Sequence, residues 1–274
     1  MTSGVIAPAT AVSGISGTTR LYALLGDPIA QVRAPALLNP VLARRATDAV
    51  LVPVQVAASD LDRVVQTLRQ VANLDGLLVT VPHKAAVLSL ADRVTDRARL
   101  AGSANALRRE PDGTWTADTF DGDGFVRGLV EAGHHPRGRR VCVVGAGGAG
   151  SAIAVALLDA GTAELRLVDT DPDRLDTLYR RLSPVYPGRI STSACPLLAD
   201  VDLAVNATPL GLRPDDPLPF PVTGLPAHAV VADIIMTPAE TALLRAAYVR
   251  GLPTQPGLPM LSHQIDAYLE FFGL

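Results

Sequence analysis

The chain has 274 residues, of which 48% are hydrophobic, and this is enough for a sizeable core in one large or two ordinary domains. Aromatic residues make up only 4%, so we expect a core of Leu, Val and Ala. The net charge of −3, the pI near 5.9 and the lack of a basic stripe or a long apolar run argue against nucleic acid, anionic membranes and a membrane span.

The first twenty residues and the cysteines bear on the compartment. Residues 1–20 are small and polar and lack the basic start and apolar run of a signal peptide, so we expect a flexible extension. The two cysteines, Cys142 and Cys195, form neither a metal-binding spacing nor a disulfide framework. These features predict a protein of the reduced cytoplasm.

Strand and helix patterns alternate along the first half of the chain. Strands are expected at Leu21–Leu25, Val50–Val56, Gly76–Val81 and Thr114–Ala117. Helices are expected at Ala36–Arg45, Ala58–Val71 and Lys84–Leu90. Such alternation is typical of a sheet that is covered by helices.

Lys84 follows the third of these strands and is the only lysine among the 24 Lys and Arg residues of the chain. Arginine therefore serves wherever a permanent positive charge is sufficient. An ammonium group, unlike a guanidinium, can lose its proton when it is buried or suitably partnered. Because ligands of open α/β sheets bind at the carboxyl ends of the strands, we interpret Lys84 as a functional amine. Composition alone does not exclude the alternative that Lys84 is a surface lysine without a function.

The alternation continues after a linker at residues 133–139. Strands are expected at Arg140–Val144, Glu164–Val168, Leu203–Asn206 and Val230–Ile235. One helix is expected before this linker, at Phe125–Ala132, and three after it, at Ser151–Ala160, Pro238–Arg250 and Ile265–Phe272. The first of these strands and its helix are joined by a glycine-rich turn, which reads G-x-G-x-x-G from Gly145 to Gly150.

This turn has the context that dinucleotide binding requires. Its glycines permit a tight turn and a close approach to a pyrophosphate, which the free N–H groups at the start of the helix hold. Asp169 follows the next strand and can accept hydrogen bonds from the adenosine ribose while repelling a 2′-phosphate. We therefore expect NAD, with NADP less favoured, although Arg166 or Arg174 could still reach a phosphate. The expected contacts are Gly145, Ala146, Gly147, Gly148, Ala149 and Asp169.

Three further interpretations bear on the kind of site that the sequence predicts. The glycine-rich turn could serve only close packing of helix on strand, which is the alternative to dinucleotide binding. None of the five histidines has metal-ligand spacing, so no metal site is expected. Cys142 lies within a strand and is interpreted as a small core residue.

The order of motifs resembles the shikimate/quinate dehydrogenase family from Gly26 to the C-terminus. Leu78 stands where the family has Asn, and Thr119 and Phe120 replace its Asn and Thr. The matching segments are Gly26-Asp27-Pro28-Ile29, Val79-Thr80-Val81-Pro82-His83-Lys84, Gly102-Ser103-Ala104-Asn105, Asp121-Gly122-Asp123-Gly124-Phe125, Gly145–Ala149, Asn206–Gly211, and Gly257–Leu261 with Gln264.

The resemblance implies an α/β protein of two domains with the active site in the cleft between them. An α/β substrate-binding domain would span residues 21–122 and be completed by the C-terminal helix in residues 251–274. A Rossmann-type, doubly wound nucleotide-binding domain would span residues 123–250. Lys84 would exchange the proton of the hydroxyl that becomes a ketone, with Asp121 as its partner. The other implied contacts are Thr80, Asn105 and Gln264 to the substrate, and Asn206, Thr208, Ile234 and Gly257 to the cofactor.

Three positions depart from the family where it holds the substrate carboxylate. Val32 and Ala34 replace two serines, and Met236 replaces a tyrosine. Since each hydrogen bond to a charged group is worth roughly 1.5–3 kcal/mol, we expect shikimate to be a poor substrate unless another group compensates. Arg33 or Gln31 could do so, but the alternation of neighbouring residues predicts that Arg33 points away from the cleft.

We therefore expect hydride transfer between NAD(P) and a ring hydroxyl of a cyclic polyol related to shikimate or quinate, with its acid group altered, moved or absent. One alternative is a genuine quinate or shikimate dehydrogenase with a rebuilt carboxylate site, and another is a non-catalytic NAD-binding sensor. A third, a protein similar to methylene-tetrahydrofolate dehydrogenase, is disfavoured by the motif order from Gly102 to Gly124. The expected partner is a small molecule, and a monomer and a homodimer both remain open.

Overall fold

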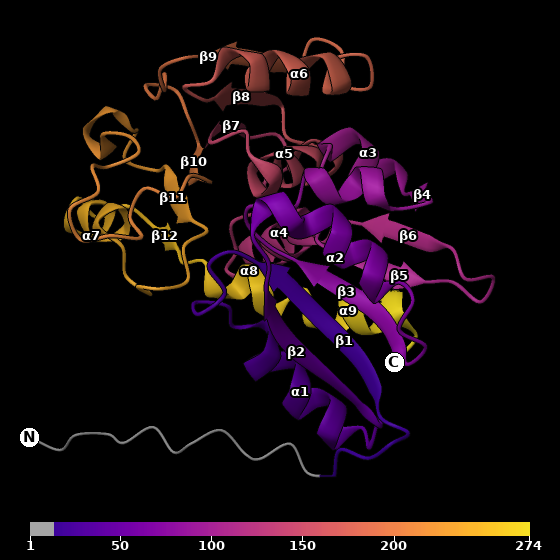
Figure 1. Cartoon of the computed structure of the whole chain (residues 1–274). Helices are drawn as coiled ribbons and strands as arrows, with labels where there is room; N and C mark the ends of the chain where they lie inside the picture. The colour runs from indigo at the N-terminus through magenta and orange to yellow at the C-terminus, as the bar shows by residue number, and fades with distance from the viewer. Residues whose placement is uncertain (1–13) are drawn as a thin grey trace, which may run out of the picture.

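The computed structural model describes residues 14–274 and places them in two sheets with helices packed against them (Figure 1). Most of the expected extension lies outside the described residues. Within its described part, the hydroxyls of Thr18 and Thr19 each donate a 2.6 Å hydrogen bond to Asp48, and Arg20 is the first residue of a strand. None of the helices within residues 14–274 is long and apolar enough to cross a membrane.

The first sheet is mixed and has the strand order β2-β1-β3-β5-β6-β4. Strands β1, β2 and β3 are parallel, whereas β5 runs antiparallel to both β3 and β6. The strands are β1 (Arg20–Gly26), β2 (Ala49–Gln55), β3 (Leu74–Val79), β4 (Arg93–Val94), β5 (Ala106–Arg109) and β6 (Trp115–Asp118). The helices are α1 (Ala34–Arg44), α2 (Leu61–Leu68), α3 (Asp96–Ala101) and the 3₁₀ helices η1 (Ala58–Asp60) and η2 (Ala86–Leu90).

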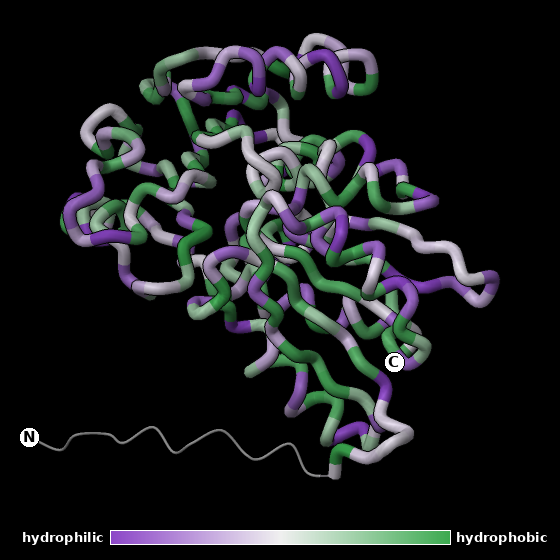
Figure 2. The backbone as a smooth tube through the Cα atoms, in the orientation of Figure 1, coloured by the Kyte–Doolittle hydropathy of each residue, from purple (hydrophilic) through white to green (hydrophobic). Residues whose placement is uncertain are grey.

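The central strands of this sheet are buried on both faces. Strands of that kind read as nearly continuous hydrophobic runs, and Figure 2 shows such runs along β1 and β3. On one face Leu24 packs with Leu38 of α1 and with helices from the end of the chain. On the other face Leu25 packs with Val65 of α2. The sheet therefore separates two apolar clusters.

The second sheet is parallel throughout and has the strand order β12-β11-β10-β7-β8-β9. This order reverses direction beside β7, at the switch point where ligands of doubly wound sheets bind. The strands are β7 (Arg140–Val144), β8 (Glu164–Val168), β9 (Ile190–Ser193), β10 (Leu203–Asn206), β11 (Val230–Asp233) and β12 (Thr254–Gln255). The helices around it are α4 (Asp121–Glu131), α5 (Gly148–Asp159), α6 (Pro172–Leu182), α7 (Ala242–Val249) and the 3₁₀ helix η3 (Val222–Gly224).

Two helices at the end of the chain return to the first sheet. They are α8 (Leu258–Ser262) and α9 (Ile265–Phe272). Leu269 of α9 is 1% exposed and packs in the same cluster as Leu24 and Leu38. The ring of Phe272 lies 4.8 Å from that of Tyr22 in β1, measured between centroids. Helix α9, near the end of the sequence, therefore packs against β1, near its start.

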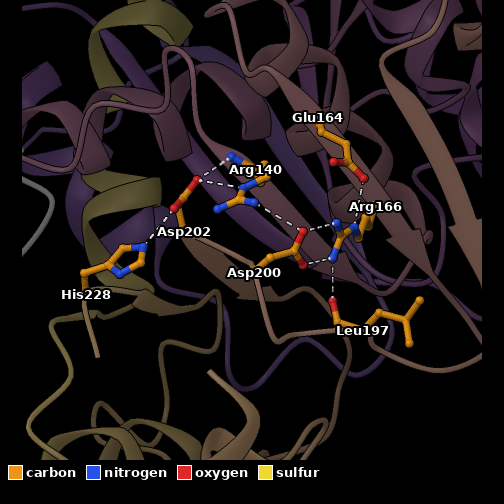
Figure 3. A network of polar contacts seen from close by, with 7 residues as sticks. All are labelled: Arg140, Glu164, Arg166, Leu197, Asp200, Asp202 and His228. Carbon is orange, nitrogen blue, oxygen red and sulfur yellow. Dashed lines mark hydrogen bonds and ion pairs between the residues drawn. The ribbon is translucent and has the colours of Figure 1, made fainter. Parts of the chain in front are cut away.

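A network of ion pairs joins the amino ends of four strands in the second sheet (Figure 3). Arg166 of β8 bridges Glu164 and Asp200, and Arg140 at the start of β7 contacts Asp200 and Asp202. Asp202 also pairs with His228, which precedes β11. Because the glycine-rich turn follows the carboxyl end of β7, this network lies at the opposite edge of the sheet.

The α/β fold with a Rossmann-type sheet is confirmed, but several boundaries differ from the expectation. The helix expected at Lys84–Leu90 is a 3₁₀ helix that begins at Ala86, so Lys84 lies in the preceding turn. The helix expected at Pro238–Arg250 begins at Ala242, because the Thr241 hydroxyl accepts the Leu244 N–H as a cap. The sequence prediction missed several elements, namely α3, α6, α8, β4, β5, β9 and β12.

Candidate active site around Lys84 and Asp121

Lys84 and Asp121 form an ion pair where the first sheet meets the second. Lys84 follows the carboxyl end of β3, and Asp121 is the first residue of α4, directly after β6. The two side chains are only 12% and 4% exposed. The preceding residue, His83, is buried, and its Nε2 lies 2.7 Å from the Val56 carbonyl, to which it donates. This bond anchors the turn that carries Lys84.

The second carboxylate oxygen of Asp121 is held by two buried amides. Asn105 Nδ2 donates to Asp121 Oδ1 at 3.0 Å, and Gln264 Nε2 donates to the same oxygen at 3.4 Å. The Phe120 N–H donates to Asn105 Oδ1, which fixes the orientation of that amide. The structure thus brings together Lys84, Asp121, Asn105 and Gln264, which lie far apart in the sequence.

Sequence reasoning missed Tyr268 of α9, whose hydroxyl donates to Gln264 Oε1 and accepts from Asn105 Nδ2 at 3.0 Å. Burial, together with the charge of Asp121, raises the pKa of Tyr268 well above its usual value of 10. The hydroxyl therefore keeps its proton at neutral pH. The signal in the sequence was the i, i+4 spacing from Gln264, which puts both side chains on one face of a helix.

Thr80 lies at the edge of this group rather than within its hydrogen-bond network. Its backbone N–H continues the sheet by donating to the Leu25 carbonyl, and its side chain is partly buried. A Cβ placed on Gly26 would lie 2.4 Å from Thr80 Cγ2. The glycine of the first motif is therefore needed so that the Thr80 side chain can lie against β1.

The three departures from the family pattern, Val32, Ala34 and Met236, belong to one apolar cluster. Leu261 and Ile265 belong to the same cluster. The two polar neighbours that could have compensated are both exposed, namely Gln31 and Arg33. Gln31 donates its Nε2 to the Pro28 carbonyl at 2.8 Å.

The glycine-rich turn lies against Lys84. A Cβ on Gly148 would lie 2.9 Å from the Cβ of Lys84, and the Ser103 hydroxyl donates to the Gly148 carbonyl at 2.8 Å. Gly145 has a φ of +106°, which only glycine adopts readily, and a Cβ on Gly147 would point into open space. The turn therefore has the backbone shape and the room that a pyrophosphate needs at the start of α5.

Asp169 lies beside this turn at the end of β8. Its carboxylate accepts the Ala146 N–H at 2.8 Å and the Asp171 N–H at 3.0 Å. Arg174 lies within 4 Å of both Asp169 and Asp171, so its charge is already shared between two carboxylates.

The remaining expected cofactor contacts shape the loops after β10 and β11. Asn206 Oδ1 accepts from both the N–H and the hydroxyl of Thr208, and its Nδ2 donates to Asp233 at 3.1 Å. Burial raises the pKa of Asp233. A Cβ on Gly257 would lie 2.4 Å from the Ile234 carbonyl. No group of three possible metal ligands occurs within residues 14–274.

Comparison with known proteins identifies relatives of the whole chain. The family model of the shikimate dehydrogenase substrate binding domain matches residues 24–107. The shikimate dehydrogenase (NADP(+)) of Rubrobacter xylanophilus is 40% identical over 96% of this chain and 94% of its own.

Two solved structures are also similar. The 5-ketofructose reductase of Gluconobacter sp. strain CHM43 has a TM-score of 0.81 at 30% identity, over 93% of this chain and 92% of its own. The quinate dehydrogenase of Corynebacterium glutamicum in complex with NAD has a TM-score of 0.82 at 30% identity, over 93% and 94%.

Proposed function

The chain belongs to the shikimate/quinate dehydrogenase family, and we propose that it transfers a hydride between NAD(P) and a ring hydroxyl of a cyclic polyol that carries no carboxylate where shikimate has one. One observation carries this proposal. The only lysine of the chain pairs with a buried carboxylate directly beside the glycine-rich turn. An amine in that position can exchange a proton with a hydroxyl whose carbon faces a nicotinamide.

In the oxidation direction, Lys84 takes the proton of the substrate hydroxyl as the carbon loses its hydride, and the C–O bond becomes a carbonyl. The bound nicotinamide supplies the acceptor for that hydride. Asp121 stabilises the ammonium ion that Lys84 becomes, while Asn105 and Gln264 hold the carboxylate in place. Reduction follows the same steps in reverse, with Lys84 as the proton donor.

The apolar cluster around Val32, Ala34 and Met236 supports an uncharged substrate. A carboxylate beside these side chains would lose solvation without gaining hydrogen bonds, which is costly. The similarity to a 5-ketofructose reductase points the same way, because 5-ketofructose is an uncharged sugar ketone. The curated relatives favour a second candidate, genuine shikimate dehydrogenase activity, since they are named for it.

A substrate screen separates these two candidates. We expect an uncharged cyclic polyol or its ketone to give a higher kcat/KM than shikimate or quinate, measured by absorbance of the reduced nicotinamide. A kcat/KM for shikimate of about 10⁴ M⁻¹s⁻¹ or more would instead establish the second candidate. The triple variant V32S/A34S/M236Y restores the three missing donors and should raise kcat/KM for shikimate by at least about tenfold.

The cofactor preference is a separate part of the proposal. The carboxylates of Asp169 and Asp171 support NAD, whereas the names of the curated relatives carry NADP(+). We expect Asp169→Asn to lower kcat/KM for NAD more than for NADP, because the substitution removes a negative charge near the expected 2′ position. Wild-type protein with a higher kcat/KM for NADP than for NAD would refute the preference.

Lys84→Met tests the proton-transfer role. A positioned general base contributes about 10²–10⁴-fold, so we expect kcat to fall by that range while NAD(P) binding, measured by calorimetry, is retained. Lys84→Arg keeps the positive charge but cannot release a proton, so it should be comparably inactive. A variant Lys84→Met with near-normal kcat would refute the role. Wild-type protein that binds NAD(P) but oxidises no polyol would favour the sensor alternative.

A further inference from the structure

A tyrosine outside the expected set of site residues is tied to the ion pair through two amides. We propose that Tyr268 is a positioning residue for the Lys84–Asp121 pair, because its hydroxyl contacts both amides, Asn105 and Gln264, that hold the Asp121 carboxylate. This inference rests on the proposed function, in which that pair moves the proton. Tyr268 lies on α9, at the far end of the sequence from Lys84.

The orientation of both amides follows from their other partners. Asn105 Oδ1 accepts the Phe120 N–H at 3.0 Å, so the NH₂ group of Asn105 must point toward the network. Gln264 Nε2 donates to the Met260 carbonyl at 3.1 Å and to Asp121, so Gln264 Oε1 must point toward Tyr268 and Asn105. An amide flip at either residue would leave a buried backbone group without its partner.

The donors in this network are scarce. The NH₂ group of Asn105 has two hydrogens but three acceptors at 3.0 Å, namely Asp121 Oδ1, Gln264 Oε1 and the Tyr268 hydroxyl. The Tyr268 O–H donates to Gln264 Oε1, which supplies that oxygen from a second source. Without the hydroxyl, the two hydrogens of Asn105 would still suffice for Asp121 Oδ1 and Gln264 Oε1, but each amide would lose one of the contacts that fix its orientation.

Water does not substitute readily for this hydroxyl. Tyr268 is 4% exposed, and the ring of Phe120 packs edge-on against it with 5.5 Å between centroids. The charged or titratable groups in contact with Asp121 are Lys84 from the turn after β3 and, through the amides, Tyr268 from α9. The neighbouring Arg97 is engaged with Asp118 and Asp123 on either side of Asp121.

The kinetic test compares two Tyr→Phe substitutions. Tyr268→Phe should lower kcat by about tenfold with little change in the KM for NAD(P). The rate should fall because Asn105 and Gln264 then hold the Asp121 carboxylate, and with it Lys84, less firmly. Tyr22→Phe is the matched control. Tyr22 is buried in the same cluster but lies outside the network, so its variant should keep wild-type kinetics.

A second measurement needs no substrate. Because Lys84 is the only lysine, protein grown with lysine labelled with ¹³C at Cε gives a single lysine resonance. In Tyr268→Phe the position and the width of this resonance should change, because the carboxylate that faces the amine is held less firmly. In Tyr22→Phe both should match the wild type. If Tyr268→Phe fails to fold, Tyr268→Met, which also lacks the donor, takes its place.

Wild-type kinetics and an unchanged lysine resonance in a folded variant at position 268 would overturn the inference. A lower melting temperature with the same resonance and the same kcat would also overturn it, because it would show a packing role only. If the wild-type protein oxidises no polyol at all, the proposed function fails. The lysine resonance would still show whether Tyr268 positions the Lys84–Asp121 pair. The two failures are therefore distinguishable.

Discussion

Lys84 reaches Asp121 beside the glycine-rich turn because the residue opposite its Cβ has no side chain. A Cβ on Gly148 would lie 2.9 Å from Lys84 Cβ, closer than such atoms normally approach. The neighbouring Gly147 differs, since a Cβ there would meet no protein atom within 4 Å. The two adjacent glycines therefore have different roles. Gly148 makes room for the lysine, and Gly147 leaves room for the expected pyrophosphate.

These roles predict opposite kinetic effects of two neighbouring substitutions. Gly148→Ala should displace Lys84 and lower kcat by about tenfold or more, since a base that is misplaced by about 1 Å can cost up to 10² in rate. Gly147→Ala should mainly raise the KM for NAD(P), because its methyl group would fill the space of the phosphates. Steady-state kinetics with both variants measure the contrast. Equal effects on kcat in the two variants would contradict it.

Lys84 could be predicted from composition because it is the only lysine of the chain, whereas Asp121, Asn105 and Gln264 were implied by the family resemblance. The structure pairs Lys84 with Asp121, which is the first residue of α4 although that helix was expected to begin at Phe125. Tyr268 could not be predicted in the same way. A tyrosine on an amphipathic helix packs equally well with or without a hydrogen bond, and only the fold shows that its hydroxyl meets Gln264 and Asn105.

At the scale of elements, the prediction succeeded where hydrophobic strands alternate with helices and failed where the signal was local. Helix α6 was missed although Asp171 caps it and Pro172 occupies its first turn, because its charged sequence hides the apolar stripe of Leu175, Leu178 and Leu182. Strand β5 was missed because two of its four residues are arginines, Arg108 and Arg109. In the structure both stack over aromatic rings.

The ion-pair network at the amino ends of the strands predicts a pH-dependent contribution to stability. The Arg166 guanidinium holds the pKa of Asp200 below its usual value of 3.8. A carboxylate whose pKa is lower in the folded than in the unfolded protein stabilises the fold at pH values above its unfolded-state pKa. That stabilisation is lost as the pH falls through the folded-state pKa. Arg166→Gln should therefore lower Tm at pH 7, and the difference from the wild type should shrink below about pH 4.

The size of that effect is limited by exposure. Asp200 is 43% exposed, so solvent screens the pair and the loss at pH 7 should be about 1 kcal/mol or less. Calorimetry at pH 7 and pH 3 measures it. Arg180→Gln is the matched control, because Arg180 and Asp176 form an exposed pair on α6 and should contribute almost nothing. A Tm difference for Arg166→Gln that grows on acidification would contradict the prediction.

For the whole molecule, the division into two domains depends on the end of the chain. Helix α9 follows the second sheet in sequence but packs on the first, beside α1. The same helix brings Gln264 and Tyr268 to the ion pair, so the site is complete only when the chain has returned. The second sheet has its own apolar cluster around β7, α5 and α6. We therefore propose that the first sheet with α9 forms one folding unit and the second sheet another.

Two leucine substitutions test this division. Leu269 of α9 and Leu167 of β8 are both almost fully buried, and replacing either with alanine should cost about 2–5 kcal/mol. If the units are separate, Leu269→Ala should accelerate amide hydrogen exchange mainly in residues 20–118, and Leu167→Ala mainly in residues 140–255, because local opening follows the loss of local packing. Exchange followed by mass spectrometry resolves these segments. Acceleration spread evenly over both segments in both variants would show a single cooperative unit, and the cleft would then be an internal feature of one domain.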